Sequence, residues 1–182
     1  MVLYEVSKFR VLTALIALEI CLKKIMTSNF QINALPESEF APLFELDNRE
    51  LAESGAIRMT VNKKLAFPCR ISLEDSELGD EVILLPYQHH KTTSPYQSRG
   101  PIYVRKNAVT AKLAVNQIPK LLNHRLLSIR GYDKQGMMKA SLVTEGQSLR
   151  ESLNEMFYNQ EIDYVHIHNA KPGCYMCEAV RA

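Results

Sequence analysis

Short runs of apolar residues, bounded by turn residues, recur along this chain and predict β-strands. These runs lie at 30–34, 81–87, 102–105, 126–132, 137–143, 163–169 and 174–180. The residues between two of them, Asp-Lys-Gln-Gly at 133–136, suit a hairpin turn. Because several successive strands are joined by short turns, the sheet is expected to be mainly antiparallel.

Apolar residues at helical spacing mark a smaller number of helices. The clearest helix is predicted to begin with a capping box, formed by Ser148 and Glu151. Its core-facing stripe consists of Leu149, Leu153, Met156 and Phe157. Shorter helices are expected over about 48–54 and 118–125. Strands outnumber helices and do not alternate with them, so the predicted fold class is α+β: a mainly antiparallel sheet with two or three packed helices in a single domain over 27–182.

Residues 1–26 stand apart from this pattern. Lys8 and Arg10 precede an apolar run at 11–18, which superficially resembles a secretory signal, but no convincing cleavage site follows. The run is also too short to cross a bilayer, which takes about 20 apolar residues. The apolar residues at 15, 18, 22 and 25 have helical spacing. We therefore predict an N-terminal extension that is either an amphipathic helix or a stretch upstream of a true start at Met26, with no membrane association.

Composition narrows the class of protein but names no activity. The chain has 182 residues, of which 46% are hydrophobic and 23% charged, as in an ordinary globular domain. Its four cysteines, at 21, 69, 174 and 177, are too few and too unevenly spread for a disulfide framework. They suit free thiols in a reducing compartment, so a cytoplasmic location is expected.

The net charge of +2 hides an uneven distribution of charge. Residues 37–81 carry eleven carboxylates against five basic side chains, whereas 88–139 carry ten basic side chains against Asp133 alone. Such a segment can bind an anionic partner. We favour the alternative, in which the acidic segment packs against the basic one and neutralises it. No nucleic-acid partner is expected, since that binding needs excess positive charge.

Coordinating and nucleophilic side chains concentrate in residues 164–177, which hold two histidines and two cysteines. His166 and His168 lie two apart in a predicted strand, so they project from the same face. The dipeptide Pro-Gly at 172–173 then turns the chain, which can bring Cys174 back beside them.

This segment supports three interpretations. The first is a metal site, with zinc bound by His166, His168 and Cys174. The second is a catalytic thiol, with Cys174 as nucleophile, His166 or His168 as base, and Asn169 orienting the base. The third is that Cys174 is a small buried core residue, because free cysteine is among the most buried residue types.

A second candidate site lies at 94–105, where a loop leads into a strand. Arg99 and Arg105 can bind a carboxylate or phosphate, and Tyr96 lies in the same loop. The chain has no glycine pattern of the Walker or Rossmann type, so those nucleotide sites are excluded. The alternative is that both arginines pair with the carboxylates of 74–81, whose acidic residues otherwise suit a solvated turn.

Several motifs together resemble one bacterial family, the domain of unknown function 1203. They are Pro-Cys-Arg at 68–70, Ser-Pro-Tyr at 94–96, Arg-Gly-Pro at 99–101 and His-Asn-Ala-Lys-Pro-Gly-Cys at 168–174, and the resemblance runs from about Phe30 to the C-terminus. The family pattern has positions that match Cys69, Arg70, Tyr96, Arg105, His168, Asn169 and Cys174, whereas Cys177 departs from it. The resemblance implies no activity, but it adds Arg70 as a possible ligand-binding residue.

Together these features lead to one hypothesis and two rivals. The hypothesis is a polar pocket where His166, His168, Asn169 and Cys174 meet Arg70, Tyr96, Arg99 and Arg105, and which binds, or also transforms, a small anionic molecule. One rival is a non-catalytic protein-interaction module with Cys174 in its core. The other is a zinc-binding domain. The sequence does not indicate the reaction or the oligomeric state.

Overall fold

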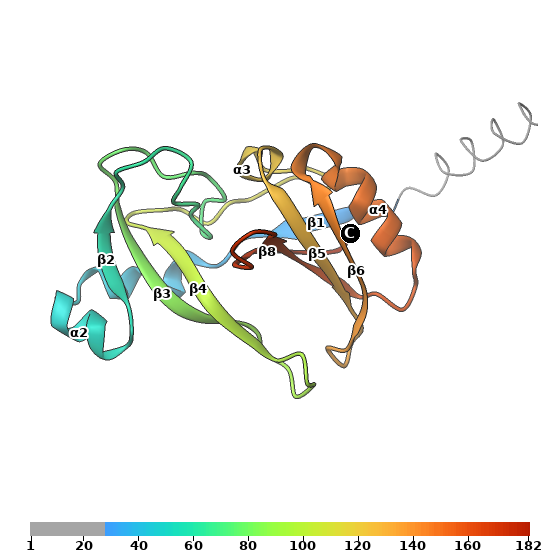
Figure 1. The fold of residues 1–182 in the computed structure, drawn as a ribbon, viewed down its shortest axis with the longest axis horizontal. Helices are drawn as coiled ribbons and strands as arrows, with labels where there is room; N and C mark the ends of the chain where they lie inside the picture. Colours follow the sequence, from blue (N-terminus) through green and yellow to red (C-terminus); the bar gives the residue numbers. More distant parts are fainter. Residues whose placement is uncertain (1–27) are drawn as a thin grey trace, which may run out of the picture.

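The described part of the chain, residues 28–182 of a computed structural model, contains two antiparallel β-sheets (Figure 1). The five-stranded sheet has the order β1 (Phe30–Asn33), β8 (Tyr175–Arg181), β7 (Tyr164–Asn169), β5 (Leu126–Tyr132) and β6 (Met138–Glu145). The three-stranded sheet consists of β2 (Ile57–Thr60), β3 (Glu81–His90) and β4 (Ser98–Arg105). In Figure 1 the smaller sheet lies on the left and the larger sheet on the right.

The predicted α+β class is confirmed, and every strand pairing is antiparallel. The strands divide between two sheets, and β2 is a strand that the pattern did not predict. β3 and β4 are both longer than expected because the loop between them is shorter, spanning only 91–97. The predicted N-terminal helix lies outside the described residues.

Within residues 28–182 the helices are few and short. α2 (Asn48–Glu53) begins at a capping box between Asp47 and Glu50, and α3 (Lys120–Asn123) is a single turn. Two 3₁₀ turns, Glu37–Glu39 and Ala41–Phe44, precede α2. α4 (Leu149–Tyr158) follows a third 3₁₀ turn, Gly146–Ser148. The predicted capping box at Ser148 is wrong: its side chain makes no capping hydrogen bond, because the 3₁₀ turn already occupies the helix start.

α4 covers one face of the larger sheet, as Figure 1 shows. Its predicted apolar stripe is buried there against the central strands, which contribute Leu127, Ile129, Val165 and Ile167. Because side chains alternate along a strand, the residues between these four point to the opposite face. In β7 those residues are His166 and His168, so burying the apolar face fixes where the histidines point.

The opposite face of the larger sheet is turned toward the smaller sheet. A second apolar cluster joins the two, and it includes Ile71, Ile83, Ile102, Val104 and Tyr175. The tips of two hairpins also meet, since Thr92 Oγ1 donates to the Gln135 carbonyl at 3.1 Å and Ser94 Oγ donates to the Gly136 carbonyl at 2.7 Å. These contacts join the two sheets through the second apolar cluster and at the hairpin tips. Within 28–182, every helix is too short or too polar to span a bilayer.

Ion pairs join the acidic and basic segments of the chain, as the favoured interpretation of the charge pattern requires. Arg105 lies 3.3 Å from Glu74 and 3.4 Å from Asp80. Arg125 is buried and pairs with Asp75. The prediction that the acidic turn at 74–75 is solvated does not hold for Asp75. This carboxylate is largely enclosed and serves as the counter-charge of the buried Arg125.

Candidate metal centre

Three imidazoles converge in the space between the two sheets. His89 comes from β3, and His166 and His168 come from β7. One ring nitrogen of each lies within 4.8 Å of one ring nitrogen of each of the other two. His166 is 2% exposed and His168 is fully buried, whereas His89 keeps part of its ring in contact with solvent. A cluster of three histidines at this spacing is an unusual use of buried space, since histidine is rarely fully buried.

A β-bulge in β3 explains how His89 reaches this cluster. Tyr87 pairs with Gly100 and His90 pairs with Ser98, so one extra residue is inserted in β3. In a regular strand His89 and His90 would point to opposite faces. The bulge changes that direction locally. As a result both rings face β7: the centroids of His89 and His168 are 5.0 Å apart, and those of His90 and His166 are 4.9 Å apart.

Each of the three histidines has one buried ring nitrogen without a hydrogen-bond partner. These atoms are Nδ1 of His89, Nδ1 of His166 and Nε2 of His168. The other nitrogen of the two buried rings is engaged, because His166 Nε2 lies 3.5 Å from the Glu178 carboxylate and His168 Nδ1 lies 3.0 Å from the Gly173 carbonyl oxygen. A buried polar atom without a partner destabilises a fold by about 1–3 kcal/mol. The three neighbouring histidines thus each keep one free nitrogen that could bind a metal ion.

A second bulge, between β7 and β8, places the residues that surround the cluster. His166 pairs with Glu178 and His168 pairs with Tyr175. The two histidines are two residues apart in β7, whereas Tyr175 and Glu178 are three apart in β8, so β8 contains one extra residue. Tyr175 consequently stacks on His89, with ring centroids 5.0 Å apart and planes 6° apart. Glu178 lies beside His166. Both residues are therefore on the histidine face of the sheet.

Burial keeps these histidines neutral at physiological pH. It lowers the pKa of His89 to about 4, with a smaller lowering from His166. It lowers the pKa of His168 to about 3, helped by the positive charge of Arg130. Burial also lowers the pKa of His166, against the opposing effect of Glu178. A neutral imidazole has a lone pair to offer, which is the form that binds a metal.

His90 is adjacent to the cluster but has no free nitrogen. Its Nδ1 lies 2.7 Å from the Tyr96 carbonyl oxygen, and its Nε2 lies 2.9 Å from the Tyr164 hydroxyl. Its ring packs against Tyr132, with centroids 4.2 Å apart, and Tyr132 stacks on Tyr164 at 5.5 Å. His90 therefore forms part of the wall that holds His166 in place.

One basic side chain shares this face of the sheet. Arg130 of β5 pairs directly with His166 of β7, and directly paired residues point to the same side. Ser128 is likewise opposite His168. Arg130 is half-buried. Among residues 28–182, no carboxylate oxygen lies within 4.0 Å of its guanidinium nitrogens, the limit for an ion pair. The polar face of β5 thus adds a guanidinium next to the histidines.

The structure brings together only some of the residues predicted from sequence. His166 and His168 belong to the three-ligand group, but His89 takes the third place that we predicted for Cys174. Cys174 lies before β8 begins, in the turn, where its Sγ is 3.9 Å from the Pro172 carbonyl oxygen. The N–H of Asn169 donates to the Cys174 carbonyl at 2.9 Å, which closes this turn. Catalytic roles for Cys174 and Asn169 stay predictions.

Cys177 is a core residue. It pairs with Ile167, on the face that α4 covers, and it is 1% exposed. Burial raises the pKa of its thiol to about 12, so the reactive thiolate is disfavoured. Its exclusion from the candidate site follows from strand register, since it points away from the histidines.

The four predicted ligand-binding residues occupy different places. Arg105 pairs with acidic side chains, as the alternative interpretation proposed. Arg70 is buried and donates through Nε to the Tyr175 carbonyl at 2.8 Å, so it supports the strand that positions the ring over His89. Burial lowers the pKa of Arg70 to about 10. Tyr96 is part-exposed and contributes its carbonyl oxygen to His90.

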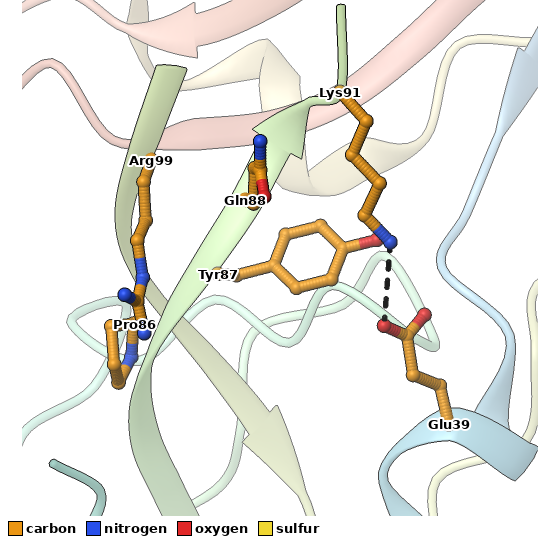
Figure 2. Close-up of a pocket in the computed structure, with 6 residues that line it drawn as sticks. All are labelled: Glu39, Pro86, Tyr87, Gln88, Lys91 and Arg99. Carbon is orange, nitrogen blue, oxygen red and sulfur yellow. Dashed lines mark ion pairs between the residues drawn. The ribbon is translucent and has the colours of Figure 1, made fainter. Parts of the chain in front are cut away.

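Arg99 lines a shallow surface pocket of about 360 Å³ together with Glu39, Pro86, Tyr87, Gln88 and Lys91. Figure 2 shows its guanidinium beside Pro86, whereas Lys91 and Glu39 lie on the far side of Tyr87. Lys91 and Glu39 are 4.0 Å apart and partly neutralise one another. None of the three histidines lines this pocket.

Sequence reasoning missed His89, Arg130 and Glu178 as members of the site. His89 lies just upstream of the arginine segment at 94–105, and the bulge that turns it toward β7 has no clear sequence signal. Arg130 and Glu178 were recognisable only once the pairing of β5, β7 and β8 was known. The alternation in β5 placed Arg130 on the polar face, but it did not say which strand lies alongside.

Comparison with known sequences and structures adds the family but no function. A family model described as "Protein of unknown function (DUF1203)" matches residues 66–181, which include all three histidines, Arg130 and Glu178. No curated protein and no solved structure matches the chain. Since the match covers well over half of the sequence, the chain belongs to the DUF1203 family of proteins of unknown function.

Proposed function

We propose that this protein binds a divalent transition metal, zinc in the first instance, through His89, His166 and His168. The observation that carries the proposal is the set of three unpartnered ring nitrogens, one on each histidine, in the space between the sheets. Imidazole nitrogen suits zinc, copper, iron and nickel. Three protein ligands are the pattern of catalytic zinc sites, where the fourth position holds water or substrate.

The surroundings of the histidines support this proposal. In metal sites the second nitrogen of a ligating histidine is usually held by a carboxylate or a backbone carbonyl, which fixes the orientation of the ring. Glu178 and the Gly173 carbonyl have these positions for His166 and His168. The lowered pKa of all three rings removes competition from protons near neutral pH.

The spacing is that of a site ready to contract around an ion. Nitrogens bound tetrahedrally to zinc at about 2.0–2.1 Å lie about 3.3 Å from one another. Since one ring nitrogen of each histidine lies within 4.8 Å of the others, the imidazoles would close by no more than about 1.5 Å to bind one ion. Such a metal ties β3 to β7, and so one sheet to the other. With an open position it acts as a Lewis acid and lowers the pKa of a bound water.

The test uses substitutions that remove the unpartnered nitrogen of each ring and, for His166 and His168, keep the engaged one. The amide nitrogen of glutamine replaces Nε2, so His166→Gln keeps the contact with Glu178. Asparagine replaces Nδ1, so His168→Asn keeps the contact with Gly173. His89→Gln removes Nδ1 from the third ring. Cys174→Ala is the matched control, because the sequence predicted that residue as a ligand.

Metal-free full-length protein is titrated with cobalt(II) and with zinc(II), and bound metal is counted by elemental analysis. We expect one ion per chain, visible cobalt bands typical of a four-coordinate site, and at least a hundredfold weaker binding in each histidine variant. Cys174→Ala is expected to bind like the wild type. The proposed ligand set is wrong if the wild type binds no stoichiometric metal. It is also wrong if Cys174→Ala loses the metal while His89→Gln retains it.

A further inference from the structure

Arg130 is a half-buried positive charge on the histidine face of the larger sheet. The guanidinium of arginine presents five N–H donors in a fixed fork. Three other arginines use these donors on carboxylates or carbonyl oxygens: Arg58 on Glu81, Arg125 on Asp75, and Arg181 on the Ile162 carbonyl. Arg130 has no ion pair among residues 28–182, although it is half-buried.

The nearest aromatic and acidic groups do not neutralise this charge. Tyr132 lies near the guanidinium, but burial raises the pKa of its hydroxyl, so it stays uncharged. Glu178 is on the same face, yet its carboxylate is 3.5 Å from His166 and forms no ion pair with Arg130. The three neutral histidines add no charge to this face, so a divalent ion bound there would make it positive despite Glu178.

We propose that the metal site takes a small molecule bearing a carboxylate or phosphate group, with one oxygen on the metal and another on the guanidinium of Arg130. This inference rests on the proposed metal site and adds the class of ligand. Register supplies the geometry, since Arg130 and His166 are direct cross-strand partners on one face. Such partners have Cβ atoms about 5 Å apart, within reach of one oxyanion.

Two further observations fit an anionic ligand. Arginine forks bind carboxylate and phosphate through two parallel hydrogen bonds, which orients the ligand as well as holding it. Ser128, opposite His168, adds a hydroxyl on the same face. His89 and Arg130 both keep part of their surface in solvent, so this side of the histidine group is not sealed by the apolar core.

The experiment separates this inference from the metal proposal. Cobalt-loaded wild type is titrated with sodium acetate, inorganic phosphate and imidazole, and the visible bands report binding at the metal. Arg130→Gln removes the guanidinium, and Arg130→Lys keeps only its charge. Arg99→Gln is the matched control, since it removes the arginine that sequence predicted as the anion clamp. Metal content and the urea midpoint of each variant show whether it is folded and loaded.

We expect phosphate or acetate to perturb the wild-type bands, and Arg130→Gln to weaken that binding at least tenfold while retaining cobalt and the response to neutral imidazole. Arg130→Lys is expected to fall between, and Arg99→Gln to match the wild type. A response to phosphate alone or to acetate alone identifies which oxyanion the site takes. Three results overturn this inference and leave the metal site standing. In the first, cobalt binds but neither anion perturbs its bands. In the second, Arg130→Gln binds both anions as tightly as the wild type, and in the third it also loses the response to imidazole. A wild type without cobalt overturns both.

Discussion

The buried histidines make the stability of the metal-free protein depend on pH. In the unfolded chain a histidine titrates near pH 6.5. In the folded chain the pKa is about 3 for His168 and about 4 for His89, because burial disfavours the charged ring. Between these values the unfolded state binds protons that the folded state does not. The free energy of unfolding therefore rises with pH through this window. The stability contributed by the two neutral rings is fully present above about pH 6.5 and is lost as the pH falls to about 4 for His89 and about 3 for His168.

The size of the effect follows from the same values. Lowering the pH from 7 to 5 protonates a histidine of the unfolded chain but not His168, which costs about 2 kcal/mol of stability. For His89, whose ring is partly in solvent, screening reduces the loss to about 1 kcal/mol. His166 shifts in the same direction and adds to the loss. From His168 and His89 alone, the metal-free protein should thus lose about 3 kcal/mol between these two pH values, a large part of a typical domain stability.

Urea unfolding in EDTA at the two pH values measures this loss, with the carboxylates contributing a background. The double variant His89→Gln/His168→Asn isolates the histidine part, and we expect it to lose about 3 kcal/mol less than the wild type. His124→Gln is the control, because His124 lies outside the cluster and is part-exposed. Equal pH dependence in the wild type and the double variant would refute the claim that burial of these two rings sets their protonation.

Three other substitutions test separate parts of the structure. Asp75→Asn leaves Arg125 buried without its counter-charge and should lower the free energy of unfolding by about 3–5 kcal/mol in a urea titration. Gly146→Ala places a Cβ against a backbone carbonyl of α3, which cannot move away as a side chain can, and should lower the free energy of unfolding by about 3 kcal/mol. Gly100→Ala is its control: with open space around that residue, it should lower the free energy of unfolding by under about 1 kcal/mol. Glu178→Gln should weaken zinc binding about tenfold in a competition titration without changing the number of ions bound; an unchanged affinity would mean that this carboxylate does not orient its histidine.

The sequence predicted most of the strands because their apolar residues and turns are local features. Asp-Lys-Gln-Gly at 133–136 formed the expected hairpin turn, with a left-handed Gly136 and two backbone N–H groups held by Asp133. Bulges were not predictable, since each depends on how a strand pairs with a distant neighbour. The greater length of β3 and β4 also depends on pairing between distant residues. Pro86 and Pro101 weaken the strand pattern in the sequence, yet the two prolines are paired with each other in the sheet.

The candidate site divides in the same way. His166 and His168 could be placed on one face from their spacing alone, because alternation is a property of any strand. Cys174 entered the predicted metal site because it is close in sequence, but it precedes β8, and the residue that groups with His166 and His168 in the structure is His89, 77 residues before His166. A side chain that distant becomes a neighbour only through sheet packing.

By itself, then, the sequence determined the class of fold, the strand that carries two of the histidines, and the family to which the chain belongs. Only the tertiary structure decided which side chains complete the site. Two bulges turn His89 and Tyr175 toward β7, and the pairing of β5 with β7 brings Arg130 opposite His166. The physical reason is that alternation and turn chemistry act between neighbours in the chain, whereas register, bulges and sheet packing are set by the burial of the whole core.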